Sequence, residues 1–241
     1  MSAGRFFLYE LRSSDPDAAR VFYAEVLGTE FWNSDSVNAS RLPEGAAAAG
    51  APSHWLGHIG VRDVEGTVDR IIAFGGARLG PRQSDAGDSA RAVLRDPFGA
   101  VLALGSDTSN SRHTPVTWHL HHSQDHQVSF AWYGGFFGWA ACDLVNLGPE
   151  THQMFAWAES EKTVGSMTDM ARRGDIHAQW LFFFPVADIE RSLAKVCALG
   201  GSTLGAMQTA HHDLVAPCND PQGAAFALYQ CRAITSVLSH K

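Results

Sequence analysis

The stretch Asp15–Gly28, DPDAARVFYAEVLG, decides the fold, because its outline returns three more times along the chain. An aspartate stands thirteen residues before a glycine at positions 15 and 28, and again at 63 and 76, 125 and 138, and 188 and 201. Aspartate accepts hydrogen bonds from the free N–H groups that begin a helix, and glycine permits the backbone turn that ends one. We therefore expect one strand–helix unit to occur four times, with a helix beginning near each aspartate.

The segments around these repeats predict strands. An apolar run, Phe6–Leu11, precedes the first helix. Ala90–Leu94 and Ala100–Leu104 flank the turn sequence Asp96–Gly99 (DPFG), and a second such turn, Asp220–Gly223 (DPQG), follows the fourth helix. Proline and glycine at these places favour tight turns between antiparallel strands. The repeated unit is therefore a strand, a helix and then several strands.

The order of the four units predicts two domains, over residues 1–107 and 115–241. The polar, aperiodic segment 108–114 is interpreted as the linker between them. The small-residue segment 46–51 is interpreted as a loop in a shortened first unit.

Composition limits the class of protein and its partners. The chain has 241 residues, of which 45% are hydrophobic and 18% charged, as in a globular protein with a real core. A formal charge of −7 argues against nucleic acid or an anionic membrane as the main partner. No apolar run approaches the ~20 residues of a membrane helix, and the four cysteines form no close-set pair. We expect a cytoplasmic protein, monomeric or homodimeric, whose partner is a small molecule.

Paired units of this kind resemble the vicinal oxygen chelate superfamily, which includes glyoxalases, bleomycin-resistance proteins and extradiol dioxygenases. The tandem glyoxalase-like members are similar in details such as Glu10-Leu11 ahead of Asp15-Pro16, Phe22-Tyr23 and Trp180-Leu181. The resemblance extends from about Arg5 to Tyr229. It implies an α+β fold of two tandem glyoxalase-like domains, each of two βαβββ modules. Each pair of modules would form an open, cupped mixed sheet around a small-molecule cavity.

The resemblance also implies where metal ligands would stand. Metal-dependent members carry His, Gln or Glu seven residues before the aspartate, and Glu four residues after the glycine of the Asp-Pro-x-Gly turn. The six positions that align here hold Leu8, Leu56, Trp118, Leu181, Ala103 and Ala227. None of these side chains can donate an electron pair to a divalent metal. The last-strand positions of units one and three do not align, but the sequence predicts no superfamily metal and no cofactor.

Glu10 and His58 are the candidate catalytic residues. Each lies five residues before the aspartate of its unit, so they occupy equivalent positions in units one and two. The equivalent positions of the second domain hold Leu120 and Phe183. A buried carboxylate beside an imidazole would shift both pKa values and could serve as an acid/base pair. The alternatives are a hydrogen-bonded structural pair or two side chains that reach solvent.

The second cup has a different candidate set. Five side chains are expected to line it and to bind a ligand: Trp118, His122, Trp180, Phe183 and Tyr229. They could equally fill the cup as core. The run 119–126 (HLHHSQDH) is rich in histidine, and alternation along a strand places His119 and His121 on one face and His122 on the other. A solvated or partly hydrogen-bonded His-rich edge is favoured over zinc binding.

The leading hypothesis is a metal-independent protein, related to glyoxalases and bleomycin-resistance proteins, that binds a small organic molecule in a sheet-lined cavity. Whether it is an enzyme stays open. The alternatives are a lyase, isomerase or hydroxylase-type enzyme using the Glu10–His58 pair, and a metal-dependent glyoxalase or dioxygenase with non-standard ligands. A further alternative is an interaction protein whose cups are filled.

Overall fold

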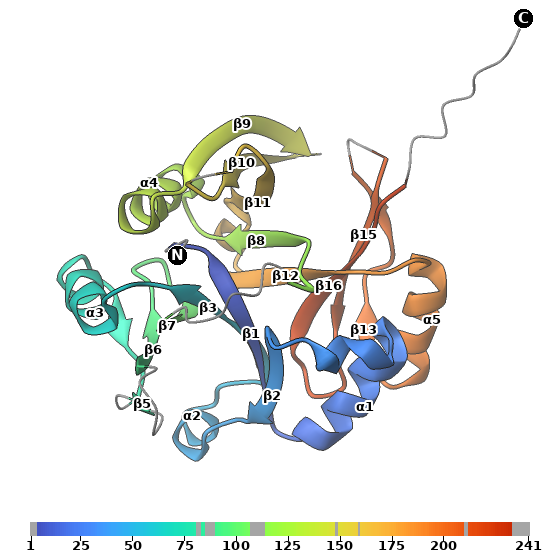
Figure 1. Cartoon of the computed structure of the whole chain (residues 1–241). Coiled ribbons are helices and arrows are strands. Elements are labelled where there is room, and N and C mark those ends of the chain that lie inside the picture. Colours follow the sequence, from blue (N-terminus) through green and yellow to red (C-terminus); the bar gives the residue numbers. More distant parts are fainter. Residues whose placement is uncertain are drawn as a thin grey trace, which may run out of the picture.

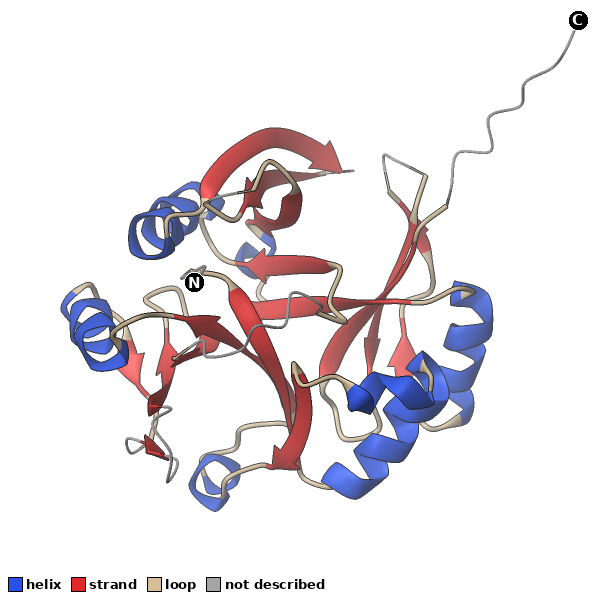
Figure 2. Ribbon diagram, viewed as in Figure 1, coloured by secondary structure: helices blue, strands red, loops and turns tan. Residues whose placement is uncertain are grey.

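The computed structural model describes residues 4–80, 83–84, 90–106, 114–147, 149–158, 160–209 and 212–232. Within these residues the chain forms two mixed β-sheets, with helices packed against them (Figures 1 and 2). The α+β class and the open mixed sheets expected from the sequence are confirmed.

The first sheet is built from residues 6–105. Its seven strands are β1 (Phe6–Ser13), β2 (Val37–Arg41), β3 (His54–Gly60), β4 (Ala77–Arg78), β5 (Gln83–Ser84), β6 (Ala90–Arg95) and β7 (Val101–Gly105). They run in the order β2-β1-β3-β7-β6-β4, and β5 also pairs with β6. The two central strands β1 and β3 are antiparallel, and each has a parallel neighbour, β2 and β7 respectively.

The second sheet repeats this plan over residues 118–230. Its nine strands are β8 (Trp118–His122), β9 (Ala140–Leu147), β10 (Glu150–Ala156), β11 (Thr163–Thr168), β12 (Gln179–Pro185), β13 (Ser202–Thr203), β14 (Met207–Gln208), β15 (Leu214–Asn219) and β16 (Ala225–Gln230). They run in the order β13-β15-β16-β12-β8-β11-β10-β9, with β14 also on β15. The central strands β8 and β12 are antiparallel, and their parallel neighbours are β11 and β16 respectively. Strand β8 is therefore equivalent to β1 of the first sheet, and β12 to β3.

The four predicted helices are present, and each begins at its predicted aspartate. They are α1 (Pro16–Leu27), α3 (Val64–Ala73), α4 (His126–Phe137) and α5 (Ile189–Ala198). The side chains before them accept hydrogen bonds from backbone N–H groups of the first turn: Asp15, Asp63, Asp125 and Asp188. These bonds satisfy donors that have no partner within the helix, which is why the spacing of aspartates predicts the helix starts.

Both predicted hairpin turns are also present. The Asp96 carboxylate accepts the backbone N–H groups of Phe98 and Ala100, at 2.9 and 2.8 Å, and so closes the turn between β6 and β7. Asp220 accepts those of Gln222 and Ala224 in the same way, at 2.9 and 2.8 Å, between β15 and β16.

The first unit is shortened, as expected, but the small-residue segment 46–51 is not entirely a loop. After α1 and a short 3-10 helix (Thr29–Asn33), the unit has the single strand β2 and then the helix α2 (Glu44–Ala48). The loop predicted over residues 46–51 is therefore wrong for its first part. Alanine has the highest helix propensity of all residues, and the alanines here extend a turn that begins at Glu44.

The two sheets turn their helix-bearing faces toward each other. One large core contains buried side chains from both sheets and from all four predicted helices. Ring contacts cross it, such as Phe6 with Phe182 (ring centroids 5.5 Å apart) and Trp55 with Phe184 (5.0 Å). Helices α1 and α5 lie side by side at one end, as Figure 1 shows. The face of each sheet turned away from this shared core is called its outer face below.

Two related sets of hydrogen bonds tie the halves together across this core. Tyr23 of α1 donates its hydroxyl hydrogen to Asp220 of the second half (3.2 Å) and accepts from the Trp55 indole (2.9 Å). Tyr133 of α4 donates to Asp96 of the first half (2.7 Å) and accepts from Trp180 (2.9 Å). Each buried hydroxyl therefore joins a strand of its own half to the hairpin turn of the other half.

The predicted linker lies outside the described residues except for Thr114, so the domain boundaries stay a prediction. In the part of the chain that the structure describes, no helix has the length and apolar composition needed to cross a membrane.

Candidate functional site

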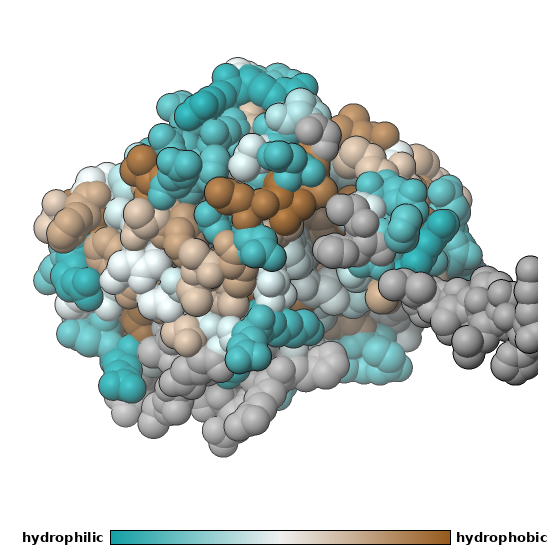
Figure 3. Space-filling view, turned by 90° about the horizontal axis from the view of Figure 1, so that it is seen from above, coloured by the Kyte–Doolittle hydropathy of each residue, from teal (hydrophilic) through white to brown (hydrophobic). Residues whose placement is uncertain are grey.

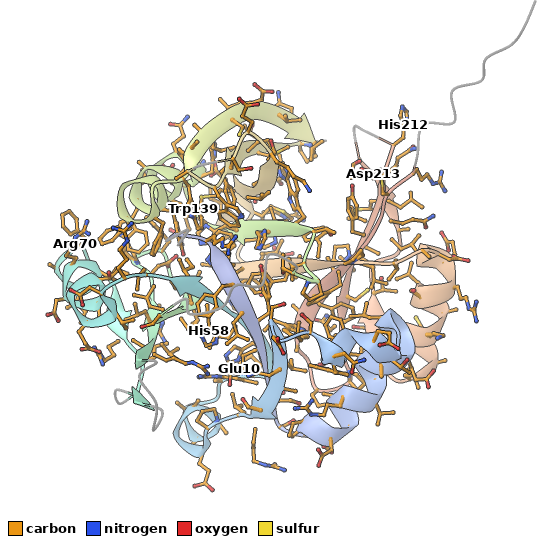
Figure 4. All side chains as sticks on the ribbon, in the orientation of Figure 1. Glu10, His58, Arg70, Trp139, His212 and Asp213 are labelled. Atoms are coloured by element: carbon orange, nitrogen blue, oxygen red, sulfur yellow. The ribbon has the colours of Figure 1, made fainter. Side chains whose placement is uncertain are left out.

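Glu10 and His58 meet on the outer face of the first sheet. Glu10 lies on β1 and His58 on the neighbouring strand β3, where the register pairs Glu10 with Leu56 and His58 with Leu8. Glu10 Oε2 is 3.2 Å from His58 Nε2 (Figure 4). Only 13% of the Glu10 side chain and 2% of the His58 side chain are exposed, so both are largely shielded from solvent.

The Glu10 carboxylate is held by three neighbours. Ser40 of β2 donates its hydroxyl hydrogen to Oε1 at 2.6 Å. Arg12 of β1 donates to Oε2 from Nε and Nη2, both at 3.3 Å, and His58 donates to the same oxygen. Burial raises the pKa of Glu10, but the hydrogen bond from His58, the charge of Arg12 and the hydrogen bond from Ser40 outweigh it and lower the pKa to about 2. Glu10 is therefore a stable anion and a weak base.

These contacts also fix the tautomer of His58. A carboxylate only accepts hydrogen bonds, so Nε2 carries the hydrogen and Nδ1 of the neutral ring carries the lone pair. Burial lowers the pKa of His58, although Glu10 opposes this, so the ring is neutral near pH 7. The His58 Nδ1 atom is enclosed, and no residue that the structure describes hydrogen-bonds it.

A second acceptor lies nearby on the same face. Asn38 of β2 pairs in register with Glu10, and its Oδ1 atom is likewise enclosed without a hydrogen-bond partner among the described residues. Leaving a buried acceptor unsatisfied costs about 1–3 kcal/mol. The outer face of the first sheet thus holds a fixed carboxylate, a neutral imidazole and two acceptor atoms that no donor among the described residues satisfies.

The strand register identifies the two remaining positions at which the superfamily would carry a metal ligand, those in the last strands of units one and three. Ala103 pairs with His58 and Ala227 with Phe183, each on the parallel neighbour of a central strand. The corresponding partners of Glu10 and Leu120 are Asn38 and Ser166. None of the eight implied positions therefore holds a carboxylate or an imidazole. No cluster of three or more His, Cys, Asp or Glu side chains among the described residues is arranged to hold a metal ion. The residues present do not fit the superfamily's metal.

The outer face of the second sheet is apolar at its centre. Leu120, Leu181, Phe183 and Ala227 form a small cluster separate from the shared core, and Trp118, Val215, Ala225 and Tyr229 pack against it. Of the five predicted ligand-binding residues, Trp118, Phe183 and Tyr229 therefore come together here. Tyr229 also donates its hydroxyl hydrogen to Asp213 at 2.6 Å. His122 lies at the end of the same face, on β8, where its register partner on β12 is Gln179.

Trp180 does not belong to this set, so its predicted place in the second cup is wrong. It precedes Leu181 on β12, and side chains alternate along a strand. Its indole therefore enters the shared core, where it donates to Tyr133. The same alternation confirms that His119 and His121 share a face opposite to His122.

The expected histidine edge is wrong in its exposure and position, although His119 and His122 are hydrogen-bonded, as the second form of that expectation allowed. His119, His121 and His122 are buried, because β8 is a central strand and not an edge. His121 Nε2 lies 3.3 Å from Asp96 Oδ2, but without the angles of a hydrogen bond. Burial lowers the pKa of His122 to about 4, and its Nδ1 atom is 3.4 Å from the Thr168 hydroxyl.

Sequence reasoning missed the residues that position Glu10. Arg12 shares the strand parity of Glu10, which is a signal that alternation could have supplied. Asn38 and Ser40 gave no signal, because the parallel pairing of β2 with β1 joins segments about 28 residues apart.

Comparisons with known proteins agree with this architecture. A family model described as "Glyoxalase-like domain" matches residues 9–104. The chain is 26% identical to putative glyoxylase CFP32 of Mycobacterium tuberculosis, over 91% of this chain and 92% of the relative. It is 22% identical to anthracycline biosynthesis protein DauV of Streptomyces sp. (strain C5), over 76% of this chain and 68% of that protein.

Solved structures show the same fold at low sequence identity. The Mn(II)-bound glyoxalase of Novosphingobium aromaticivorans superimposes with a TM-score of 0.59 at 15% identity, over 95% of this chain and 82% of that one. The 2,2',3-trihydroxybiphenyl 1,2-dioxygenase of Sphingomonas wittichii gives a TM-score of 0.61 at 12% identity, over 95% and 90%.

Proposed function

We propose that this chain, which has a glyoxalase-like domain over residues 9–104 and the fold of the vicinal oxygen chelate proteins, binds a small organic molecule on the outer face of its first sheet. The observation that carries the proposal is the Glu10–His58 pair, with the unsatisfied acceptors His58 Nδ1 and Asn38 Oδ1 beside it. A ligand that donates hydrogen bonds would satisfy both acceptors and recover the free energy that their burial costs. Because both atoms are enclosed, the neighbouring side chains would have to move aside to admit it.

The proposed binding needs no superfamily metal. The eight positions where the resemblance implies ligands hold Leu8, Leu56, Trp118, Leu181, Asn38, Ala103, Ser166 and Ala227. An amide or hydroxyl oxygen alone is a weak ligand, and the other six side chains are apolar. Binding would rest instead on hydrogen bonds and on the fixed charge of Glu10.

A catalytic role is the second candidate, and the tautomer of His58 favours it. Nδ1 of the neutral ring carries a free lone pair, so it could accept a proton from a ligand O–H or C–H group. The resulting imidazolium would be stabilised by Glu10, which would stay ionised because its pKa is about 2. In a lyase or isomerase of this kind, His58 would be the base and Glu10 the residue that orients it.

A thermal-shift screen of small organic metabolites tests the proposal. Compounds that stabilise the wild-type protein are expected to lose their effect on His58→Phe and on Asn38→Leu. Phe183→Leu, at the position of the second sheet equivalent to His58, is the matched control and should keep the response. Compounds that act equally on all four proteins would contradict binding at this face.

A further inference from the structure

A row of polar side chains crosses the outer face of the second sheet, away from the Glu10–His58 pair. The register aligns His122 of β8 with Thr168 of β11, and Thr168 with His152 of β10. Adjacent strands lie about 4.8 Å apart, so the two histidines are separated by one intervening strand on the same face. The sequence analysis predicted neither His152 nor Thr168 as a site residue.

Each of these histidines uses one ring nitrogen within the sheet. His152 Nδ1 lies 3.1 Å from the Ser166 hydroxyl, and His122 Nδ1 lies 3.4 Å from the Thr168 hydroxyl. No residue that the structure describes hydrogen-bonds either Nε2 atom, and neither atom is enclosed. The His122 ring is buried and the His152 ring half-buried, and each has one imidazole nitrogen that no described residue uses.

Both rings are neutral at pH 7. Burial is the main cause, and it lowers the pKa of His122 and of His152 to about 4 each. The hydroxyl groups that face the Nδ1 atoms can donate or accept, so either tautomer is possible and each Nε2 atom can accept or donate. Protonating such a ring at pH 7 is unfavourable by about a thousandfold, which disfavours a ligand that needs cationic partners.

Apolar side chains border the row on one side, and carboxylates that already have cationic partners lie on the other. Met154 pairs in register with Ser166, and Leu120 of the separate apolar cluster also borders Ser166. The nearby carboxylates have cationic neighbours: Asp169 lies 3.4 Å from Arg172, and Glu150 lies 3.9 Å from Arg173. Seen from the side on which β9 and β10 lie, the surface mixes hydrophilic areas with a strongly hydrophobic one (Figure 3).

From this arrangement we infer a second binding site, formed by His122 and His152 together with the apolar cluster around Leu120. It takes an uncharged, mainly apolar molecule that carries two hydrogen-bonding groups. The apolar body packs against the cluster, and each polar group meets one Nε2 atom. The site is on the other sheet from Glu10 and His58, so it does not depend on the function proposed for that pair.

Two probes of the same shape and different charge test the inference: naphthalene-2,6-dicarboxamide, which is uncharged, and naphthalene-2,6-dicarboxylate, a dianion. Binding to the full chain is measured by fluorescence titration at pH 7. The wild-type protein is expected to bind the dicarboxamide at least tenfold more tightly than the dicarboxylate. His152→Leu and His122→Leu should each weaken dicarboxamide binding by about five- to tenfold, the effect of one lost hydrogen bond. The exposed His177→Leu is the matched control and should bind as the wild type does.

Several outcomes would overturn the site. They are absence of dicarboxamide binding up to about 1 mM, equal affinity for the dianion, or unchanged affinity in both histidine variants. Loss of binding in His58→Phe with retention in His152→Leu would place the probe on the first sheet, which overturns this site and supports the other. Stoichiometric binding of Zn²⁺ alone, lost in His152→Leu, would make it a metal site instead. If a variant fails to fold, an NMR titration of the wild-type protein tests the site instead. The His152 ring signals are expected to shift as dicarboxamide is added, and unchanged signals would overturn the site.

Discussion

Tyr9 and His119 occupy equivalent positions in the two halves of the chain, six residues before Asp15 and Asp125, and they hydrogen-bond to each other across the shared core. Tyr9 Oη lies 2.6 Å from His119 Nε2. His119 Nδ1 lies 2.8 Å from the carbonyl oxygen of Val164, which only accepts, so Nδ1 carries the hydrogen and Nε2 accepts from Tyr9. This hydrogen bond therefore joins the central strands β1 and β8 at positions that are equivalent in the two halves of the chain.

Tyr9→Phe should destabilise the protein. The substitution leaves His119 Nε2 buried without a donor, which costs about 1–3 kcal/mol of unfolding free energy. Urea denaturation of the wild type and the variant measures the difference. His119→Phe in the Tyr9→Phe background removes the orphaned acceptor and should cost less than the sum of the single changes. An unchanged midpoint for Tyr9→Phe would contradict a role for this bond.

Acid should destabilise the wild type through His119. Burial lowers the pKa of His119 from 6.5 to about 4, so the folded state holds the neutral ring. This contribution is fully present above pH 6.5 and is lost as the pH falls toward 4, by up to an amount on the order of 3 kcal/mol. His119→Gln should flatten the stability profile between pH 7 and 4. The prediction fails if the wild-type and variant profiles run parallel over that range.

Tyr133→Phe and Tyr23→Phe should have similar effects, because the two hydroxyls make equivalent bonds in the two halves. Each change leaves a buried carboxylate, Asp96 or Asp220, without one donor, and we expect a loss of about 1–3 kcal/mol in each case. Thermal unfolding of the single and double variants measures this. Val21→Ala, on the exposed face of α1, is the control and should change stability by less than about 0.5 kcal/mol.

Glu10→Gln should weaken ligand binding or turnover while the protein still folds. The amide keeps an acceptor for His58 but removes the charge that would stabilise a protonated ring. The pKa of Glu10 is about 2, below its usual 4.5, so the charge adds stability above pH 4.5 that disappears as the pH falls toward 2. The variant should lose this acid-range dependence. Lower thermal stability at neutral pH with unchanged ligand binding would show that the pair is structural.

Purified protein should hold no stoichiometric divalent metal at the superfamily positions. Elemental analysis is expected to find less than one Zn, Fe, Mn or Ni per chain, and treatment with EDTA should leave the melting temperature and any ligand binding unchanged. The chemical reason is that Leu8, Leu56 and Ala103 on the first sheet cannot coordinate a cation. One tightly held metal per domain, or an activity abolished by chelators, would overturn the prediction.

Local features of this protein follow from its sequence. The helix starts and hairpin turns depend on hydrogen bonds within four residues of an aspartate, so their positions could be read from Asp15, Asp63, Asp96 and Asp220 alone. The face that Glu10 and His58 share follows from strand alternation and from their equal distance to the next aspartate.

What the tertiary structure decided is which segments meet and which face each side chain occupies in the assembled sheets. Strand alternation alone would have excluded Trp180 from the second cup, because its position has the opposite parity to those of Leu181 and Phe183. Only the packing of one sheet on the other sends that indole to Tyr133 and buries His119 against Tyr9. Likewise, Asn38 and Ser40 come beside Glu10 only through the pairing of β2 with β1. Register between distant strands depends on the whole set of side chains that must be buried together, and no short stretch of sequence carries that information.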